Sequence, residues 1–398
     1  MLAEVPQGEG PAHGALLQVL SPGLERVDSP CPHFGPAEGA RCGGCEWLHV
    51  AYSRQLETKE RTLVETLRRV GRFDPKSYLL LPTIPSPSAL RYRARAKFHH
   101  DRKQGRLVFF ERRSHTPVAL RSCELLEPEL DALREAMGKA LLAARLFPRE
   151  VTLEWSRHEG RGSAHLRVPS LLGDTPERAE DLLAGLRELK GLVLTAEGGG
   201  TLLAGDPVLR QERRPHETGT ALQRSRPDIF LQANRLANAR LVERALELLR
   251  PDGEALLELY CGSGNFTGPL AACAKSVHAV EEQGPALDLA RADLGGGAVR
   301  FFAGDALALC AAFAREARGE RPPFGAALLD PPRQGARGVG EALRDLRVAR
   351  FVYVSCDPAT LARDLRACVS AGYHLQAVQA VDMFPQTHHV EAVALLAR

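Results

Sequence analysis

Short apolar runs recur through the C-terminal half of the chain, each long enough for a strand buried on both faces. Segments suited to helices separate them. Strands that alternate with helices predict an α/β fold with a doubly wound parallel sheet, right-handed crossovers and helices on both faces. The first run begins at Ala255, and the others are Val277–Val280, Val299–Phe302, Phe324–Leu329 and Phe351–Val354.

The run from Ala255 leads into a glycine turn. Gly262 and Gly264 indicate that the backbone passes close to a ligand, and a helix expected from Phe266 to about Lys275 would turn its first amides toward it. Glu281 ends the next strand nineteen positions after Gly262, the spacing that places a carboxylate on a ribose hydroxyl. A plain strand-to-helix turn is the alternative for the glycines alone.

The later strands deliver further polar side chains to the same edge of the predicted sheet. Asp305 follows the third run, Asp330 follows the fourth and Cys356 follows the fifth. Because the carboxyl ends of parallel strands meet at one edge, we expect these groups to line one crevice.

Cys356 has the position of a nucleophile. Asp357 and Pro358 suit the cap and first residue of a helix that runs to about Val369, and helix amides lower a thiol pKa from about 8.5. A buried strand cysteine is the alternative.

Glu391 lies at the start of the final apolar strand, Val390–Leu396. A carboxylate is costly there unless it is paired or used, and a raised pKa would suit a general base. His388 and His389 are alternative bases, or ordinary polar residues of a turn.

From Arg91 the pattern changes to a period of two, which predicts a strand with one apolar and one cationic face. Between Arg91 and Arg121 there are ten Lys or Arg residues against two acids, a plausible footprint for RNA phosphates. A solvated charged face is the alternative. Further short strands predict a mixed, largely antiparallel middle domain. The cations of the predicted strand are Arg91, Arg93, Arg95 and Lys97.

Nine cysteines in a protein expected to be cytoplasmic are unlikely to form disulfides, so clustered ones indicate metal ligands or catalytic groups. The glycines between Cys42 and Cys45 let the backbone wrap around a metal. Four thiolates suit tetrahedral zinc or a 4Fe-4S cluster, and buried free thiols are the third possibility. The candidate ligands are Cys31, Cys42, Cys45 and Cys123.

The 398 residues suggest two or three domains, and no apolar run approaches the length of a membrane span. Residues 53–70 predict an amphipathic helix used for packing. The segment from there to Ser88 reads as a connector, and 210–226 as a linker. The expected state is a monomer.

These residues resemble a known family, the bacterial RNA 5-methyluridine (uracil-5-) methyltransferases that use S-adenosylmethionine, and in particular the iron-sulfur branch that acts on 23S ribosomal RNA. The resemblance runs from Cys31 to the C-terminus. Its motifs are CPHFG with CGGC, IFLQANR (229–235), LELYCGSGNFTG, LLDPPRQGA (328–336), YVSCDPATLARDL and DMFPQTHHVE. The combination is far more specific than a single glycine turn.

The resemblance implies a Rossmann-like class I methyltransferase domain over 216–398. Cys356 would attack carbon 6 of a flipped-out uridine, and Glu391 would remove the proton from carbon 5. The four cysteines would hold a 4Fe-4S cluster, with zinc less expected, and the strand from Arg91 would contact RNA. The implied methyl-donor site consists of Gln232, Tyr260, Asn265, Glu281, Asp305 and Asp330.

The same resemblance suggests three earlier units: 1–29 as the remnant of an RNA-binding β-barrel, 30–75 as the cluster segment with its helix, and 76–215 as a central RNA-binding domain. Three features depart from the family pattern. The region before Cys31 is too short for a complete barrel, ten residues separate Cys31 from Cys42 where the family has about half as many, and Asp357 stands where the family has Asn.

Four other functions compete with this expectation. Transfer RNA is the second expected substrate for the same chemistry. A nicotinamide dehydrogenase would use the glycine turn and Glu281 but not Asp330 and Cys356, and a radical enzyme would need a tighter three-cysteine motif. A non-catalytic iron-sulfur RNA-binding protein would be indifferent to Cys356→Ala.

Overall fold

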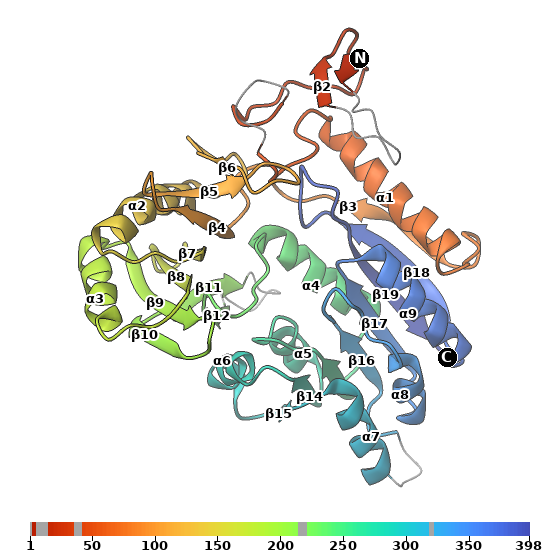
Figure 1. The fold of residues 1–398 in the computed structure, drawn as a ribbon. Coiled ribbons are helices and arrows are strands. Elements are labelled where there is room, and N and C mark those ends of the chain that lie inside the picture. Colours follow the sequence, from red (N-terminus) through yellow and green to blue (C-terminus); the bar gives the residue numbers. More distant parts are fainter. Residues whose placement is uncertain (1, 5–14, 36–41, 214–220, 318–321) are drawn as a thin grey trace.

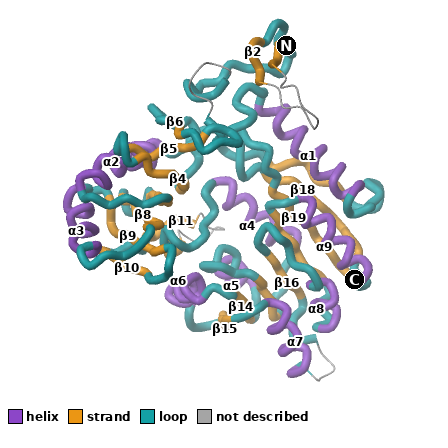
Figure 2. Tube along the Cα trace, viewed as in Figure 1, coloured by secondary structure: helices purple, strands orange, loops and turns teal. Residues whose placement is uncertain are grey.

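The computed structural model describes residues 2–4, 15–35, 42–213, 221–317 and 322–398. Residues 95–205 form one lobe, and residues 235–398 together with 52–84 form a second lobe beside it (Figure 1). In each lobe the strands form a sheet that helices cover (Figure 2). Among the described residues, no helix has the length and apolar character that a membrane crossing requires.

The second lobe contains a sheet of eight strands, in which only β19 runs antiparallel to its neighbours. Chain order reverses between β13 and β16, which is the switch point where α/β sheets bind their ligands. The doubly wound sheet predicted from the apolar runs is therefore confirmed. In spatial order the strands are β15 (Val299–Ala303), β14 (Ser276–Glu281), β13 (Ala255–Leu259), β16 (Ala326–Leu329), β17 (Arg350–Ser355), β19 (Glu391–Ala397), β18 (His374–Val381) and β3 (Leu79–Ile84).

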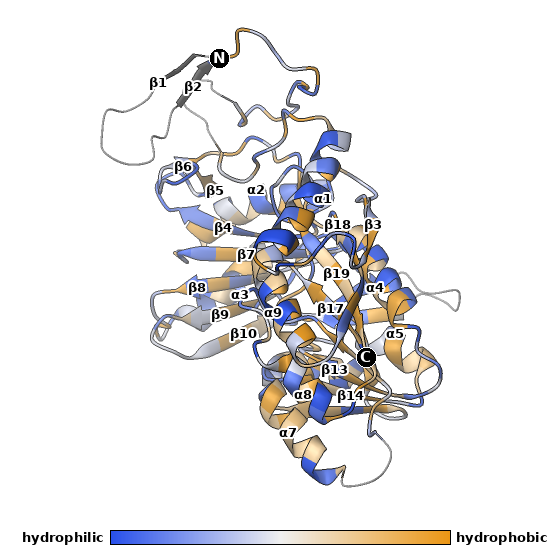
Figure 3. Cartoon of the chain, turned by 90° about the vertical axis from the view of Figure 1, so that its right-hand side faces the viewer, coloured by the Kyte–Doolittle hydropathy of each residue, from blue (hydrophilic) through white to orange (hydrophobic). Residues whose placement is uncertain are grey.

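Helices cover both faces of this sheet because successive strand residues point to opposite sides. Leu328 packs into one core with Leu241 and Phe266, whereas Leu329 packs into the other with Leu63 and Leu365. The central strands carry mostly hydrophobic colours in Figure 3. The helices of this lobe are α1 (Tyr52–Arg69), α4 (Arg235–Leu249), α5 (Thr267–Cys273), α6 (Gly284–Leu294), α7 (Ala306–Glu316), α8 (Val339–Asp345) and α9 (Pro358–Ser370).

The first lobe is a seven-stranded sheet in which only β8 and β9 pair in parallel, so the predicted mixed, largely antiparallel domain is confirmed. Two helices, α2 (Pro128–Ala143) and α3 (Thr175–Gly185), share its apolar core. The strands in spatial order are β10 (Thr201–Gly205), β9 (Leu189–Ala196), β8 (Arg161–Val168), β7 (Glu150–Ser156), β4 (Arg95–Asp101), β5 (Arg106–Phe110) and β6 (Pro117–Val118).

Three local predictions are wrong. The segment before Ser88 is not only a connector, because β3 adds to the edge of the large sheet by pairing with β18. The expected linker contains an antiparallel ribbon of β11 (Leu209–Arg213) and β12 (Ala221–Ser225). The strand expected from Arg91 begins at Arg95, because Arg91 has a left-handed backbone with φ of 51° and Arg93 bridges to Leu126 and Asn234 outside this sheet.

Near the N-terminus, β1 (Leu2–Glu4) pairs with β2 (Ala15–Gln18). The connection between these two strands lies outside the described residues, as does the long insertion 36–41 between Cys31 and Cys42.

Candidate active site

The glycine turn and Glu281 form a single hydrogen-bonded unit at the switch point. One Glu281 carboxylate oxygen accepts a hydrogen bond from the Gly262 backbone N–H at 2.9 Å, and the other accepts one from Gln283 N–H at 2.8 Å. Gly262 and Gly264 have φ of 55° and 89°, which a residue with a Cβ rarely adopts. The turn thus holds a carboxylate with lone pairs free for further donors.

Tyr260 and Asp305 flank this turn. Tyr260 follows β13 with a left-handed φ of 63°, a strained conformation typical of functional sites. Burial, together with the nearby carboxylate of Asp305, raises the Tyr260 pKa to about 12. Asp305 caps α7 by accepting a hydrogen bond from Ala308 N–H at 2.8 Å.

Asn265 and Gln232 lie in the segments before α5 and α4. The side-chain amides of Asn265 and Asn238 exchange two hydrogen bonds, of 2.8 and 3.0 Å, which join the glycine turn to α4. Gln232 is buried two residues before Asn234, whose side chain caps α4 through Ala237 N–H.

Cys356 and Glu391 come together across two neighbouring antiparallel strands. Ser355 of β17 pairs with Ala392 of β19, so the next residue of one strand lies beside the preceding residue of the other. Glu391 is buried, and its pKa is raised well above the usual range by burial and by the nearby Asp330. Burial also raises the pKa of Asp330 to about 7.

The expectation of a lowered pKa for the Cys356 thiol is wrong. Burial raises this pKa to about 11, and the carboxylates of Glu391 and Asp330 act in the same direction. Asp357 is occupied as the cap of α9, because it accepts hydrogen bonds from Ala359 and Thr360 N–H at 2.9 and 3.0 Å. A cation near the sulfur would favour the thiolate.

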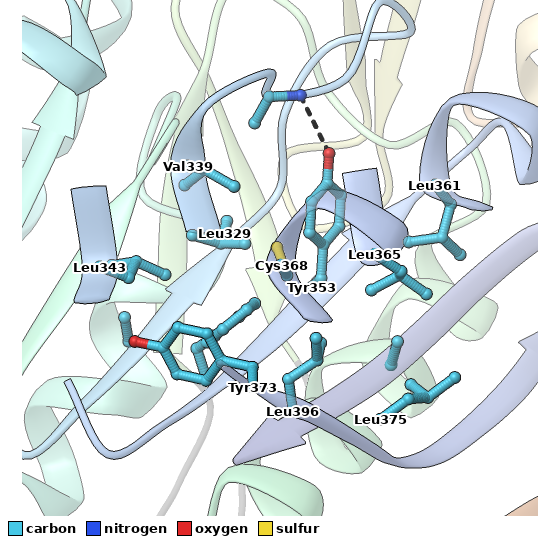
Figure 4. Packing of buried hydrophobic residues seen from close by; sticks show 14 of the residues in the cluster. Leu329, Val339, Leu343, Tyr353, Leu361, Leu365, Cys368, Tyr373, Leu375 and Leu396 are labelled. Carbon is cyan, nitrogen blue, oxygen red and sulfur yellow. Dashed lines mark hydrogen bonds between the residues drawn. The ribbon is translucent and has the colours of Figure 1, made fainter. Parts of the chain in front are cut away.

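Arg333 supplies such a cation, and no role was predicted for it from the sequence. The positive charge of its guanidinium opposes the rise in the pKa of the Cys356 thiol, and the guanidinium lies 3.2 Å from Nδ1 of His389. The loop after it is anchored where Ala336 N–H donates to the Tyr353 hydroxyl at 3.0 Å (Figure 4). The only sequence signal was its place three residues after Asp330 in LLDPPRQGA.

The two histidines differ in their surroundings. Burial and the neighbouring cations lower the pKa of His389 to about 4, so its ring is neutral near pH 7. His388 is more exposed, and its Nδ1 lies 3.3 Å from a carboxylate oxygen of Glu46.

The four candidate ligand cysteines line one cavity of about 70 Å³, which is walled by apolar side chains such as Leu48 and Phe109. Burial raises their thiol pKa values, that of Cys42 to about 11. Within the described ranges, no three His, Cys, Asp or Glu side chains stand close enough to hold one metal ion. The cysteines converge, but their spacing does not match a single-ion site.

The four cations of the predicted strand face have partners within the protein. Carboxylates from neighbouring segments pair with three of the four cations, and Arg93 instead lies over the rings of Tyr92 and Phe384, 5.8 Å from each centroid. Arg91, Arg95 and Lys97 are thus neutralised within the protein. The pairs are Arg91–Glu124 at 2.8 Å, Arg95–Glu154 at 3.0 Å and Lys97–Glu150 at 3.0 Å.

The strand order, with the glycine turn at the switch point, defines a class I methyltransferase fold, which binds S-adenosylmethionine. A solved structure, the Pyrococcus abyssi tRNA (uracil-54, C5)-methyltransferase in complex with S-adenosyl-L-homocysteine, matches with a TM-score of 0.74 at 20% identity. The match covers 100% of this chain and 92% of that one. At this identity the likeness shows the fold alone.

Sequence comparison gives the family. A family model described as tRNA (Uracil-5-)-methyltransferase matches residues 211–398. The chain is 35% identical to the 23S rRNA (uracil(1939)-C(5))-methyltransferase RlmD of Alkalilimnicola ehrlichii, over 97% of this chain and 86% of that protein. It is 36% identical to the protein of the same name from Pseudomonas entomophila, over 96% and 82%. The chain belongs to the RNA (uracil-5-)-methyltransferase family, and it is an S-adenosylmethionine-dependent enzyme.

Proposed function

We propose that this enzyme methylates carbon 5 of a specific uridine in 23S ribosomal RNA, with Cys356 as nucleophile and Glu391 as general base. Support for the substrate comes from the relatives named above, which carry that activity in their names. The observation that carries the residue roles is the pairing of β17 with β19, which brings the thiol beside a buried carboxylate.

The reaction follows from these side chains. The Cys356 thiol loses its proton to solvent, and the Arg333 guanidinium stabilises the thiolate. The sulfur bonds to carbon 6 of uracil, and the electrons of the 5,6 double bond make carbon 5 nucleophilic. S-adenosylmethionine, when bound, supplies the methyl group and leaves as S-adenosylhomocysteine. Glu391 accepts the proton from carbon 5, a step for which the raised pKa of this carboxylate is suitable. The 5,6 double bond then re-forms and the sulfur leaves carbon 6 as a thiolate.

The proposed donor site surrounds the glycine turn. Glu281 suits the ribose hydroxyls because backbone N–H groups hold its carboxylate at the end of β14. Asp330, whose pKa is raised to about 7, lies at the end of β16 on the other side of the switch point. The full set consists of Gln232, Tyr260, Asn265, Glu281, Asp305 and Asp330.

Methyl transfer to defined RNAs tests the proposal. We expect incorporation from labelled donor into a 23S rRNA fragment, mapped as 5-methyluridine by mass spectrometry. Cys356→Ala should abolish incorporation while RNA binding is retained. Unchanged turnover of this variant would exclude Cys356 as nucleophile. Methylation of a tRNA transcript alone would favour the second candidate substrate, which the names of the family model and the solved structure support.

We also propose that Cys31, Cys42, Cys45 and Cys123 hold a 4Fe-4S cluster. Around one zinc ion, bonds of about 2.3 Å bring four sulfurs within about 4 Å of one another. A cubane cluster is larger and separates its thiolates further, which suits a cavity of about 70 Å³ without a tight single-ion group among the described residues. Anaerobically purified protein should contain iron and sulfide and show charge-transfer absorption, and Cys45→Ser should lose both. Stoichiometric zinc would contradict the cluster.

The role of Arg91, Arg93, Arg95 and Lys97 as RNA ligands stays a prediction. Contacts with phosphate would have to replace the internal ion pairs, which is easiest for Arg91 and Lys97, whose side chains are 46% and 58% exposed. Lys97→Ala should weaken RNA binding equally for all RNA sequences. The slope of the logarithm of the binding constant against the logarithm of the salt concentration should become shallower by about one, since one counterion fewer is released. Lys139→Ala on α2 is the matched control. If Lys97→Ala and Lys139→Ala weaken RNA binding equally, the strand from Arg91 is not a specific RNA-binding face.

A further inference from the structure

The loop that joins β18 to β19, residues 382–390, is held by a helix more than 300 residues earlier in the chain. Lys59 Nζ of α1 lies 2.5 Å from Asp382 Oδ1 and also donates to the Phe384 carbonyl at 3.0 Å. The Tyr52 hydroxyl donates to the second Asp382 oxygen at 2.9 Å. The side chains of Lys59 and Asp382 are 1% and 0% exposed, so the ion pair is fully buried.

A second contact fixes the middle of the loop. Gln55 and Gln386 form a reciprocal pair, in which Gln55 Nε2 donates to Gln386 Oε1 and Gln386 N–H donates to Gln55 Oε1, both at 2.9 Å. Gln386 has a left-handed φ of 68°, a conformation that surrounding contacts must hold. The buried side of α1 is therefore polar where it meets this loop.

The segment directly after Cys45 contacts the same point. The backbone N–H groups of Glu46 and Trp47 both donate to the Gln386 carbonyl at 3.0 Å. Gln55 also donates to the Trp47 carbonyl at 3.2 Å. The cysteine segment, α1 and the loop are thus one hydrogen-bonded assembly.

Stability alone does not account for these residues. A buried ion pair recovers little more than the cost of removing both charges from water, and apolar side chains of similar size often serve as well. What a buried pair with extra hydrogen bonds adds is a defined position. The loop it positions leads directly into Glu391, the first residue of β19.

We propose that Lys59 and Gln55 are positioning residues, which set loop 382–390 and thereby place the Glu391 carboxylate for its reaction. This inference rests on the proposed function, in which Glu391 removes the proton from carbon 5. It gives the cysteine segment a part in catalysis through the backbone of Glu46 and Trp47, independent of any contact with RNA.

The test uses the full-length protein and two variants. Lys59→Met alone would leave the Asp382 carboxylate buried without its cation, so it is combined with Asp382→Leu, which restores apolar packing. Gln55→Met breaks the second contact. For both variants we expect kcat to fall about tenfold or more, because misplaced catalytic groups lose rate steeply with distance. The KM for S-adenosylmethionine and the affinity for RNA should not change.

A second measurement separates positioning from general damage. If proton removal becomes slow, the covalent complex between Cys356 and methylated RNA accumulates, and it is detected as a denaturant-resistant band. Glu57→Gln, on the exposed face of α1, is the control and should match the unmodified protein in kcat and in adduct level.

Wild-type kcat in the Gln55→Met variant would overturn the inference, as would a fall in kcat without accumulation of the adduct. If the double variant does not fold, Gln55→Met alone decides between these results. The proposed function fails separately, when the unmodified protein does not methylate RNA or when Cys356→Ala remains active.

Discussion

The backbone N–H of Gly262 donates a hydrogen bond of 2.9 Å to the carboxylate of Glu281, so two features nineteen residues apart form one hydrogen-bonded unit. Removal of this carboxylate should weaken S-adenosylmethionine binding about 10- to 100-fold, since a hydrogen bond to a charged group contributes about 1.5–3 kcal/mol. Calorimetric titration of Glu281→Ala with the donor measures this. Glu282→Ala, one residue further and exposed, should bind normally, and equal affinity of both variants would exclude Glu281 from the donor site.

The reactivity of Cys356 should depend on pH far into the alkaline range. Because its pKa is raised to about 11, the reactive thiolate is the minor form at neutral pH. Alkylation by iodoacetamide, followed by mass spectrometry of the Cys356 peptide, should accelerate about tenfold per pH unit from about pH 7 to 10. A cysteine peptide with a pKa of about 8.5 should level off above about pH 9. A plateau of Cys356 at the same pH would contradict the raised pKa.

Arg333 should support the thiolate. Arg333→Met removes the guanidinium whose positive charge lowers the Cys356 pKa, so this pKa should rise further and kcat should fall at least about tenfold. Arg337→Met, in the same loop and also exposed, should leave both quantities unchanged. The comparison combines methyl-transfer kinetics with the alkylation assay, and normal alkylation of Arg333→Met would remove Arg333 from this role.

Asp330 should reduce stability at neutral pH. Its folded-state pKa is raised from 3.8 to about 7, so the folded protein binds the extra proton and loses stability as pH rises through this window. Asp330→Asn removes the penalty, which should raise the free energy of unfolding at pH 8 by on the order of 2–4 kcal/mol and by less at pH 5. Urea denaturation at both pH values measures the difference. Asp330→Asn should also lose methyl transfer. An equal rise in the free energy of unfolding at both pH values would show that the ionisation of Asp330 is not its cause.

The local pattern was sufficient for the strands that carry the candidate site. Parallel strands buried on both faces are continuous apolar runs, so their carboxyl ends, and with them Glu281, Asp305, Asp330 and Cys356, could be located before the fold was known. β3 could not be found this way, because Pro82 interrupts its pattern and because its partner at the sheet edge, β18, lies 297 to 298 positions away along the chain.

Charges and polar contacts were the part that only the tertiary structure decided. The carboxylates that neutralise Arg91, Arg95 and Lys97 lie 33 to 59 positions away, and the partners of Lys59 lie more than 300 away. A single stretch of sequence shows an ionisable side chain but not the residues that contact it in the folded protein. The sequence by itself determined which residues stand at the ends of the strands, because that order is local. The tertiary structure decided the pKa of Cys356 and the setting of Glu391, because burial and Coulomb interactions depend on distance in space and not along the chain.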